Sequence, residues 1–474
     1  MATLGMAFDI ASNALQADQS ALNIVANNVG NASTPGYTRE VANWQQNDPV
    51  TINSITYGQG AQVTGPVSQR DRVLEQSLQQ QNQIASASNA RLTALDQLQS
   101  VFSQATGSGS SSSANSADGL SQDISVFFNS LSELESSPSN SSLREQVLTS
   151  AQNLAGDFQA ASSQVAEQQT SLDQQSASLV NQINALTQSI AKLNVQIQST
   201  SPNADAGTLE DQRQQDISQL AQLIGVHQIQ TEDNGLTITT SSGALLVSEG
   251  GAYALSTAPT GGVTHFYDSE GNDITASLAT GGGQIGGLLT VRDQDIPQVQ
   301  SALDTLAFDL GTAVNAANQA GSDANGNAGV AVFNLPGTAA GAAAGISVAI
   351  TSPSQIAAAA TGLGSSDDTN LLAMANLANQ AIVAGATPAN YFSDFVSALG
   401  SLVSEVQTQN AAQQASATQL QNVVNSLSSA DLNEEASALS NLEQSYQAAA
   451  KIFTILSSVM TAALNLGEPT TYTV

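Results

Sequence analysis

The sequence predicts a mainly α, elongated, multi-domain protein in which the terminal N- and C-helices pair as a coiled coil. Apolar residues recur in heptads at both ends of the chain, and further heptads fill its long middle. Alternation of apolar and polar residues, typical of strands, is strongest in one short interval after residue 226. We therefore expect a long helical-bundle rod with a small antiparallel β module inserted into it.

The first helix is predicted over residues 4–29, because its apolar stripe alternates steps of four and three residues. That stripe, the N-terminal seam, consists of Leu4, Phe8, Ala11, Leu15, Asp18, Leu22, Val25 and Val29. The helix should end in the segment 27–31, whose asparagine and glycine residues tolerate the left-handed conformation that terminates helices.

A tight turn and extended chain should follow the first helix. Pro35 and Gly36, inside the segment 33–37, predict a type II turn, because proline fixes φ at the first inner position and glycine supplies a positive φ at the second. Extended, glycine-punctuated chain is expected over 51–60, and Trp44 is interpreted as a packing anchor.

Helices are predicted over 71–104 and, after a Gly/Ser-rich loop at 107–113, as two or three further helices over 118–225. The most regular stretch has leucines one heptad apart, at Leu172, Leu179, Leu186 and Leu193. These heptads fit either an intermolecular coiled coil or an intramolecular core. The break at Ser201-Pro202-Asn203 and the helix that returns after it favour the core.

The β module is expected over 226–280, where apolar and polar residues alternate between glycine pairs. Helices should resume at 292–320, give way to short strands near 330–350, and return at 368–384 and 390–427. The last helix should start at a capping box of Asp431 and Glu434 and stop before Gly467 and Pro469. Its apolar stripe, the C-terminal seam, is Leu439, Leu442, Tyr446, Ala449, Phe453, Leu456, Met460 and Ala463.

These elements divide the chain into three expected domains. An axial-core domain combines 1–70 with 428–474 and holds the paired terminal helices and an extended spoke. A helical rod domain combines 71–225 with 286–427, and includes a short Gly/Ala-rich irregular segment at 321–355. The small β module occupies 226–285. Tyr37 and Tyr446 could each lie at a contact between subunits or pack within one subunit.

Composition excludes several classes of function. The chain has 9 basic and 39 acidic residues, a formal net charge of −30, so no nucleic-acid partner is expected. The same deficit of lysine and arginine argues against binding an acidic membrane surface, and the absence of a long apolar run argues against membrane insertion. With no cysteine there can be no disulfide and no thiolate nucleophile. No cleavable signal peptide is predicted, because the opening segment is amphipathic.

No enzyme, catalytic residue, metal or cofactor is predicted. Gly281-x-Gly283-x-x-Gly286 matches a dinucleotide fingerprint by spacing alone and is better interpreted as a hinge, because the strand that should precede it is missing. Asp323 to Gly329 begins like a calcium loop, but the glycine and glutamate of an EF-hand are absent from their positions. His227 and His265 have no metal-ligand spacing.

Three separated segments resemble the axial proteins of the bacterial flagellum, which form its rod, hook and junction. The residues 27–37, with Asn27, Asn28, Asn31, Thr34, Pro35, Gly36 and Tyr37, resemble the N-terminal signature of that family. The residues 431–435 and 444–450 resemble its C-terminal signature. An internal block from Gly286 to Phe333 resembles the hook-associated protein 1 branch, whose members form the hook–filament junction.

The resemblance implies a structural subunit that joins hook to filament by helical polymerisation. It also implies export in an unfolded state without a cleaved signal, an extracellular location on the flagellum, and four partners. These partners are further copies of the chain, the hook protein, a second hook–filament junction protein, and an export chaperone on the C-terminal seam between Leu442 and Met460. Other expectations remain open: another axial protein such as hook protein or flagellin, a secreted coiled-coil adhesin, or an enzyme grafted on an axial scaffold.

Overall fold

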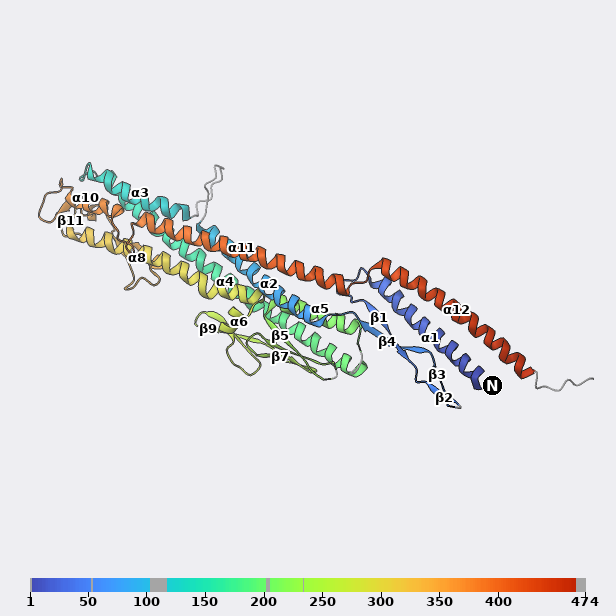
Figure 1. Cartoon of the computed structure of the whole chain (residues 1–474). Coiled ribbons are helices and arrows are strands. Elements are labelled where there is room, and N and C mark those ends of the chain that lie inside the picture. Colours follow the sequence, from blue (N-terminus) through green and yellow to red (C-terminus); the bar gives the residue numbers. More distant parts are fainter. Residues whose placement is uncertain (1, 53, 103–116, 202–204, 233, 466–474) are drawn as a thin grey trace, which may run out of the picture.

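The computed structural model describes residues 2–52, 54–102, 117–201, 205–232 and 234–465. The loop expected at 107–113, the Pro202-Asn203 part of the predicted break, and the stop at Gly467 and Pro469 lie outside the described residues. The molecule is elongated, with both terminal helices at one end and the helical rod extending toward the other (Figure 1). The mainly α fold predicted from the heptads is confirmed. No helix in the described ranges has the length and apolar character needed to cross a bilayer.

The terminal region consists of two paired helices and a ribbon of strands. Helix α1 (Ala2–Asn31) lies along α12 (Leu432–Asn465), its partner in space although the two are far apart in sequence (Figure 1). Strands β1 (Glu40–Gln46) and β4 (Ala61–Ser68) form an antiparallel ladder against α1, in which Glu40 faces Ser68. Strands β2 (Val50–Ile52) and β3 (Ile55–Tyr57) form a separate hairpin at the end of this ribbon.

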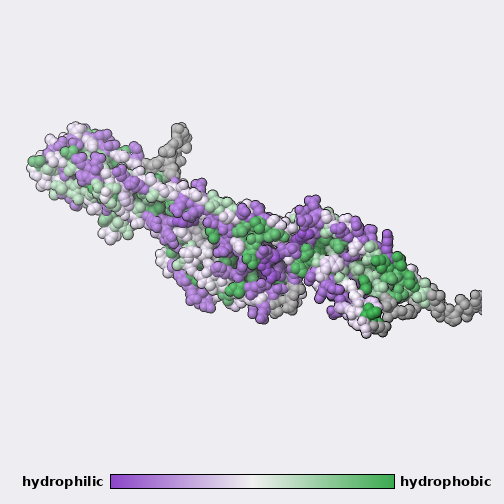
Figure 2. All heavy atoms as spheres, viewed as in Figure 1, coloured by the Kyte–Doolittle hydropathy of each residue, from purple (hydrophilic) through white to green (hydrophobic). Residues whose placement is uncertain are grey.

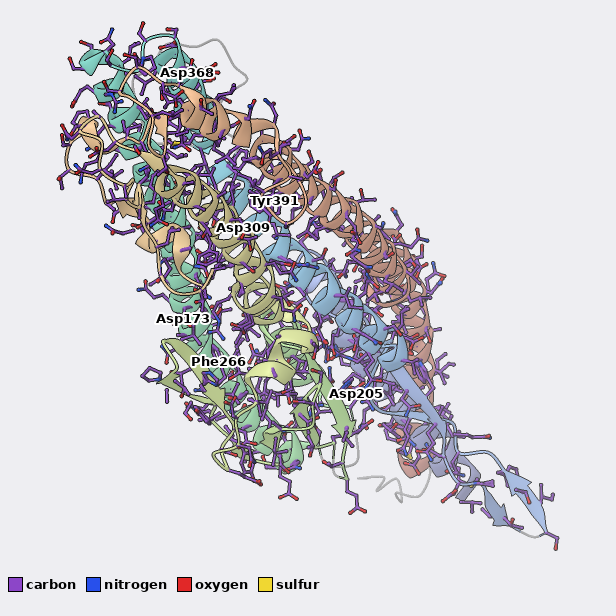
Figure 3. All side chains as sticks on the ribbon, turned by 90° about the vertical axis from the view of Figure 1, so that its left-hand side faces the viewer. Asp173, Asp205, Phe266, Asp309, Asp368 and Tyr391 are labelled. Atoms are coloured by element: carbon purple, nitrogen blue, oxygen red, sulfur yellow. The ribbon has the colours of Figure 1, made fainter. Side chains whose placement is uncertain are left out.

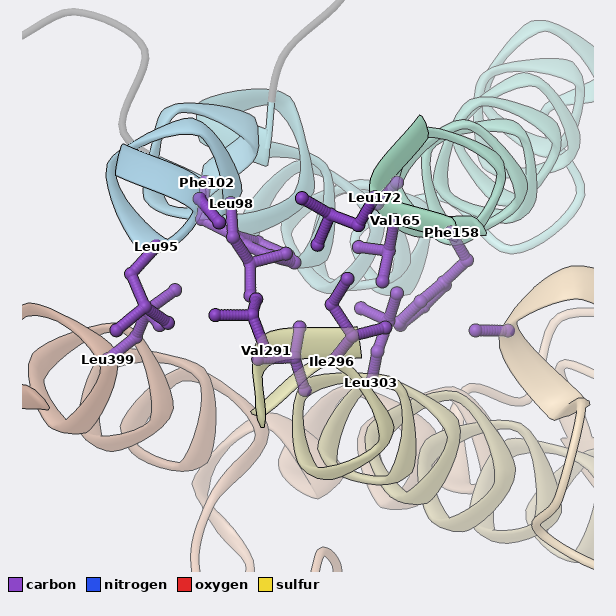
Figure 4. Packing of buried hydrophobic residues seen from close by; sticks show 14 of the residues in the cluster. Leu95, Leu98, Phe102, Phe158, Val165, Leu172, Val291, Ile296, Leu303 and Leu399 are labelled. Atoms are coloured by element: carbon purple, nitrogen blue, oxygen red, sulfur yellow. The ribbon is translucent and has the colours of Figure 1, made fainter. Parts of the chain in front are cut away.

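The rod is built from long helices around one continuous apolar core. They are α2 (Arg72–Phe102), α3 (Ala117–Glu135), α4 (Ser141–Thr200), α5 (Thr208–Leu223), α8 (Ile296–Ala320) and α11 (Pro388–Ser428). Figure 4 shows side chains of α2, α4, α8 and α11 meeting in this core. The heptad leucines Leu172 and Leu179 are buried in it, and Leu186 packs against it. Leu193 is also buried within the subunit, so the intramolecular interpretation of that heptad repeat is confirmed.

The β module contains a four-stranded antiparallel sheet in the order β5-β6-β7-β8 and a hairpin. The sheet strands are β5 (Val226–Gln230), β6 (Leu236–Thr240), β7 (Leu245–Ser248) and β8 (Gly251–Ala252), and the hairpin strands are β9 (Ser256–Thr260) and β10 (Val263–Tyr267). Arg292 anchors the hairpin to the rod. Its buried guanidinium pairs with Asp173 of α4 at 2.6 Å and donates to the carbonyl of Thr264 at 2.8 Å. Arg292 lies in a π-helical turn, Val291–Asp295, that leads into α8.

The glycines expected to form a hinge join two short helices, α6 (Thr275–Gly281) and α7 (Gly283–Thr290). Gly282 and Gly283 turn the chain with φ of +94° and +72°, whereas Gly286 lies inside α7. A side chain at the next residue, Gly287, would place its Cβ 2.1 Å from the carbonyl oxygen of Ala87 in α2. The hinge interpretation is therefore wrong for the second half of the motif, where glycine permits close helix packing.

The far end of the rod is less regular. The helix expected over 368–384 is shorter, because α10 (Thr369–Asn376) passes into a 3-10 turn, Leu377–Asn379, and then into irregular chain. The strands expected near 330–350 are present as β12 (Phe333–Asn334) and β13 (Ser347–Val348), with α9 (Ala342–Gly345) between them. Further short elements are β11 (Gly321–Ser322), β14 (Ala359–Ala360) and the 3-10 turn Pro353–Gln355.

Candidate assembly site

The pairing of α1 with α12 brings the two predicted seams together. Phe8 and Phe453 stack with ring centroids 4.5 Å apart. In α12 the predicted C-terminal seam is the inward face: Ala449 is buried, and the half-buried members are Leu439, Leu442, Tyr446, Phe453, Leu456, Met460 and Ala463. In α1 the buried members of the N-terminal seam are Ala11, Asp18 and Val25, and the half-buried members are Leu4, Phe8, Leu15 and Leu22.

Val29 does not belong to the N-terminal seam in the structure, because its side chain is 42% exposed. At this end of α1 the preceding residue, Asn28, is buried and binds Glu435 in the first turn of α12. Helix α12 begins at Leu432, so little of the partner helix remains beside Val29. The heptad spacing that placed Val29 on the seam does not show where the partner helix begins.

The signature segment forms the predicted type II turn at the end of α1. Gly36 has a φ of +79°, and the amide of Tyr37 donates to the carbonyl of Thr34 at 3.2 Å. Asn31 supports the turn from the helix side, because its Nδ2 donates to Asn27 Oδ1 at 2.8 Å and its Oδ1 accepts from Thr34 at 3.3 Å. The turn brings the ring of Tyr37 back against the last turn of α1.

Asn28 connects this turn to the C-terminal helix. Its Nδ2 donates to the carbonyl of Glu40 at 2.8 Å and to Oε2 of Glu435 at 3.1 Å. Its Oδ1 accepts from the amide of Glu40 at 3.0 Å and from the hydroxyl of Tyr37 at 2.8 Å. One buried amide therefore orients the start of β1, the turn and the first turn of α12.

Arg39 reinforces the same contact between the two ends of the chain. Its guanidinium pairs with Glu434 at 2.6 Å and with the buried Glu435 at 2.7 Å. Its amide donates to the carbonyl of Ser428, the last residue of α11, at 2.8 Å. The predicted capping box is only half formed: Asp431 Oδ1 accepts from the amide of Asn433 at 2.7 Å, but the carboxylate of Glu434 binds Arg39. The start of α12 is held by Asn28 of α1 and by Arg39, the residue before β1.

A second cluster joins the spoke, which is the segment between α1 and α2 that holds strands β1 to β4, to the rod. The amide of Thr38 donates to Asp211 of α5 at 3.0 Å, and Arg70 pairs with Asp211 and, at 3.3 Å, with Glu75 of α2. Burial raises the pKa of Asp211 and of Glu75, and the charge of Arg70 opposes that rise. Burial, followed by the charge of Glu40, raises the pKa of the Tyr37 hydroxyl far above its usual range, so this hydroxyl stays a donor.

A pocket of about 250 Å³ lies beside the turn and is lined by residues such as Pro35, Tyr37, Arg70 and Asn425. The groups around it hold helices and strands in position. The described contacts give the signature residues a mechanical role at the meeting point of α1, α12, the spoke and the rod.

Sequence reasoning missed four residues that form these contacts: Glu435, Arg39, Arg70 and Asp211. Glu435 entered the sequence analysis only as part of the segment 431–435, whereas it binds Asn28, 407 positions earlier in the chain. One usable signal was present. In a chain with 9 basic residues among 474, an arginine on either side of the spoke is unusual enough to suggest a specific acidic partner.

Comparison with known proteins identifies two matching family models. Residues 110–333 match the model described as the flagellar hook-associated protein FlgK helical domain, and residues 8–38 match the model described as flagella basal body rod protein. The first covers α3 through the beginning of β12, and the second covers most of α1 and the signature turn. The two models thus fall on the rod and on the candidate assembly site.

Flagellar hook-associated protein 1 from Escherichia coli is 28% identical over 69% of this chain, and that from Bacillus subtilis is 26% identical over 86%. The matched part spans 59% of the Escherichia coli protein and 87% of the Bacillus subtilis protein. The structure of the flagellar hook junction protein FlgK from Burkholderia pseudomallei has the same fold, with a TM-score of 0.65, 19% identity and coverage of 73% of this chain and 99% of that one. This chain is thus similar to flagellar hook-associated protein 1 over most of its length, and its helical rod matches the FlgK helical domain over residues 110–333.

Proposed function

We propose that this chain is a structural subunit of the bacterial flagellum that joins hook to filament by helical polymerisation outside the cell. The observation that carries the proposal is the pairing of α1 with α12 through Asn28, Arg39 and Glu435. This pairing brings both ends of the chain into one elongated unit, with the rod extending from it (Figure 1). Such a subunit can stack head to tail, because its two sides present different surfaces.

The partners that we propose are further copies of the chain, the hook protein on one side and a second hook–filament junction protein on the other. The names of the matched relatives support these neighbours. The exposed apolar residues of the terminal region, among them Val50, Ile55, Ile452 and Ile455, also support them, because exposed apolar clusters of this kind mark interaction surfaces.

We also propose that the chain is exported unfolded and that a chaperone covers the C-terminal seam around Leu442 to Met460 before assembly. In α12 this seam has only α1 to shield it, and most of its members are half-buried. When α1 is detached, the seam is a continuous apolar stripe that would aggregate without cover. Deleting 439–465 should abolish chaperone binding, and full binding by the truncated chain would exclude this site.

The alternatives predict different locations. Hook protein or flagellin would be distributed along the whole hook or filament, and an adhesin would act on its own outside the cell. An enzyme on an axial scaffold would need a catalytic site. The one close His–carboxylate pair in the described residues, His265 Nδ1 with Asp273 at 2.6 Å, lies on the partly exposed β10 hairpin. It has no third group that would define a catalytic triad in these contacts.

The test is to express the epitope-tagged chain in its own bacterium after deletion of the gene. We expect gold-labelled antibody to mark one narrow band at the hook–filament boundary, and we expect filament growth and motility to return. Label along the whole hook or filament would favour the axial alternatives. Label absent from flagella, with motility unrestored, would reject the proposed function.

A further inference from the structure

We propose that, in the assembled polymer, the β2–β3 hairpin of one copy docks on the outer face of α12 in the neighbouring copy. This inference rests on the proposed function and specifies the contact by which two copies meet. It is carried by two exposed apolar surfaces in the terminal region, which lie on different sides of α1 and match in length and charge.

The first surface is a second stripe on α12. Beside the residues that face α1, the residues Ala448, Ile452, Ile455, Val459 and Ala462 repeat at steps of four and three on the outer side of the helix. The three large side chains are all exposed, and Ile455 is 61% exposed. A helix with one heptad stripe needs one partner, whereas α12 carries two neighbouring stripes and has α1 on only one of them. The second stripe is thus uncovered within the subunit (Figure 2).

The second surface is one face of the β2–β3 hairpin. Cross-strand pairs place Val50 opposite Tyr57 and Ile52 opposite Ile55, so all four side chains lie on the same face. Val50 and Ile55 are exposed, with Ile55 at 57%. The opposite face carries the hydrogen-bonded pair Thr51 and Thr56. A sequence that alternates apolar and polar residues in this way is typical of a hairpin with one buried face.

Much of the hairpin face is uncovered inside its own subunit. Ile52 and Tyr57 are half-buried, but Val50 and Ile55 are exposed, no described helix packs extensively along β2 or β3, and Figure 3 shows the hairpin projecting to one side of the molecule. Two-stranded hairpins are marginally stable in water unless one face packs against another element. The apolar face of this one is therefore expected to be covered by something outside the subunit.

The two surfaces fit each other in length and charge. From Ile452 to Val459 the helical stripe extends about 10 Å, at ~1.5 Å per residue, and a three-residue strand extends about 10 Å, at ~3.3 Å per residue. Asp48 precedes the hairpin face, and Lys451 directly precedes Ile452 of the helical stripe. Both are exposed, and neither has an ion-pair partner among the described residues. Lys451 is the one basic residue of α12, so a docked segment with an acidic residue at this position would be favoured.

The arrangement of the surfaces selects a head-to-tail contact. Helix α1 packs against α12 and also against β1 and β4, so it separates the helical stripe from the ribbon that carries the hairpin (Figure 1). A contact between two different patches continues from copy to copy and generates a helical or ring-like layer. The alternative, in which the α12 stripes of two copies pack on each other, would close a dimer and stop there.

The test uses the absence of cysteine from the native chain. Ile55→Cys and Ile455→Cys are introduced singly and together, flagella are isolated from the complemented deletion strain, and a short bismaleimide is added. We expect the double variant to give a ladder of dimers, trimers and larger species, and each single variant to remain monomeric. A matched control pairs Ile455→Cys with Val73→Cys, an exposed position on α2 in the rod, and should give no ladder.

Dimers from Ile455→Cys alone would overturn the proposal in favour of α12 packing on itself. No ladder from the double variant, with gold label still at the hook–filament boundary, would also overturn it while leaving the proposed function intact. Label absent from that boundary in the wild-type chain would reject the proposed function itself. As a second measurement, Asp48→Lys and Lys451→Asp should each lower the ladder yield several-fold. Their combination should restore it, and a combination no better than either single exchange would contradict the charge match.

Discussion

The rod and the terminal helix pair use similar heptad patterns but bury them to very different extents. In the rod, side chains such as Leu95, Phe127 and Phe158 are fully buried among several helices. In α12, of the side chains that the structure describes, only Ala449 and Glu435 are buried, and the remaining seam is half-buried against a single partner helix. Burial of apolar area supplies most of the free energy of folding. The rod therefore holds itself together, and the terminal pair depends on a few polar contacts and on neighbouring subunits.

The largest effect is expected from Phe158→Ala in α4. Removing a fully buried aromatic ring should lower the free energy of unfolding of the rod by about 3–5 kcal/mol, because both its burial and the packing around it are lost. Urea denaturation followed by circular dichroism measures the change.

Phe453→Ala, in the terminal pair, is the matched control. Its ring stacks on Phe8 but is half-buried, so the main unfolding transition should move much less. Equal losses in the two variants would mean that the rod and the terminal helices unfold as one unit, and would remove the difference in burial as an explanation.

The second prediction concerns Glu435→Ala at the contact between the two ends of the chain. The side chain is 1% exposed and binds Arg39 and Asn28, so its removal leaves two polar groups without their partner. We expect the free energy needed to separate α1 from α12 to fall by about 2 kcal/mol. This value is lower than that of a fully buried pair because Arg39 is partly exposed. Hydrogen exchange over 10–28 and 436–456, compared with α4, measures it.

Glu434→Ala provides the control, because Glu434 pairs with the same arginine but is 62% exposed at its side chain. An exposed pair contributes about 0–1 kcal/mol, so exchange in the terminal helices should hardly change. A faster exchange in α4 of either variant would show that the effect is not confined to the terminal region.

These two regions also differ in how far sequence could predict them. The helices could be predicted from the periodicity of apolar residues, and the turn at Pro35 and Gly36 could be predicted from the φ that each residue favours. The contact of Asn28 with Glu435 could not be predicted, because nothing local couples residues at opposite ends of the chain. Arg292 illustrates the same point in the rod: which of 39 acidic residues binds it depends on how α4 and β10 pack.

Other misses have local physical causes. The helix expected over 368–384 was too long because periodicity does not distinguish an α-helix from a 3-10 turn followed by irregular chain. Trp44 was expected to anchor packing, yet its side chain is 48% exposed on β1. Large aromatic residues are usually buried in an isolated domain, so that expectation fails where a surface is left for neighbours.

The third prediction is a pH effect inside the rod. Burial raises the pKa of Asp157 in α4 to about 6, and the neighbouring carboxyl of Asp123 in α3 adds to the rise. Because this pKa exceeds the ordinary value of 3.8, its stabilising contribution is complete below about pH 4 and is lost as pH rises through about 6. Asp157→Asn should therefore raise the free energy of unfolding by about 1 kcal/mol at pH 7, a value discounted for water screening.

The comparison at pH 3, where Asp157 is mostly protonated in both the folded and the unfolded state, should show little difference between variant and wild type in urea denaturation. Asp123→Asn should give a smaller gain at pH 7, because it relieves the repulsion between the two carboxyls but leaves the burial of Asp157 unchanged. A gain that is equal at both pH values would attribute the effect to packing and not to charge.

The smallest effect is expected at Val29, the residue that the strict heptad placed on the N-terminal seam. Its side chain faces solvent. Val29→Ser should therefore change the free energy of opening of α1, measured by hydrogen exchange, by less than about 0.5 kcal/mol. Val25→Ala, one turn earlier and buried, removes about two methylene equivalents and should cost about 1–2 kcal/mol in the same measurement. If Val29→Ser proved as costly as Val25→Ala in the isolated subunit, Val29 would have to be buried against α12, and its exposure at the end of the helix pair would be contradicted.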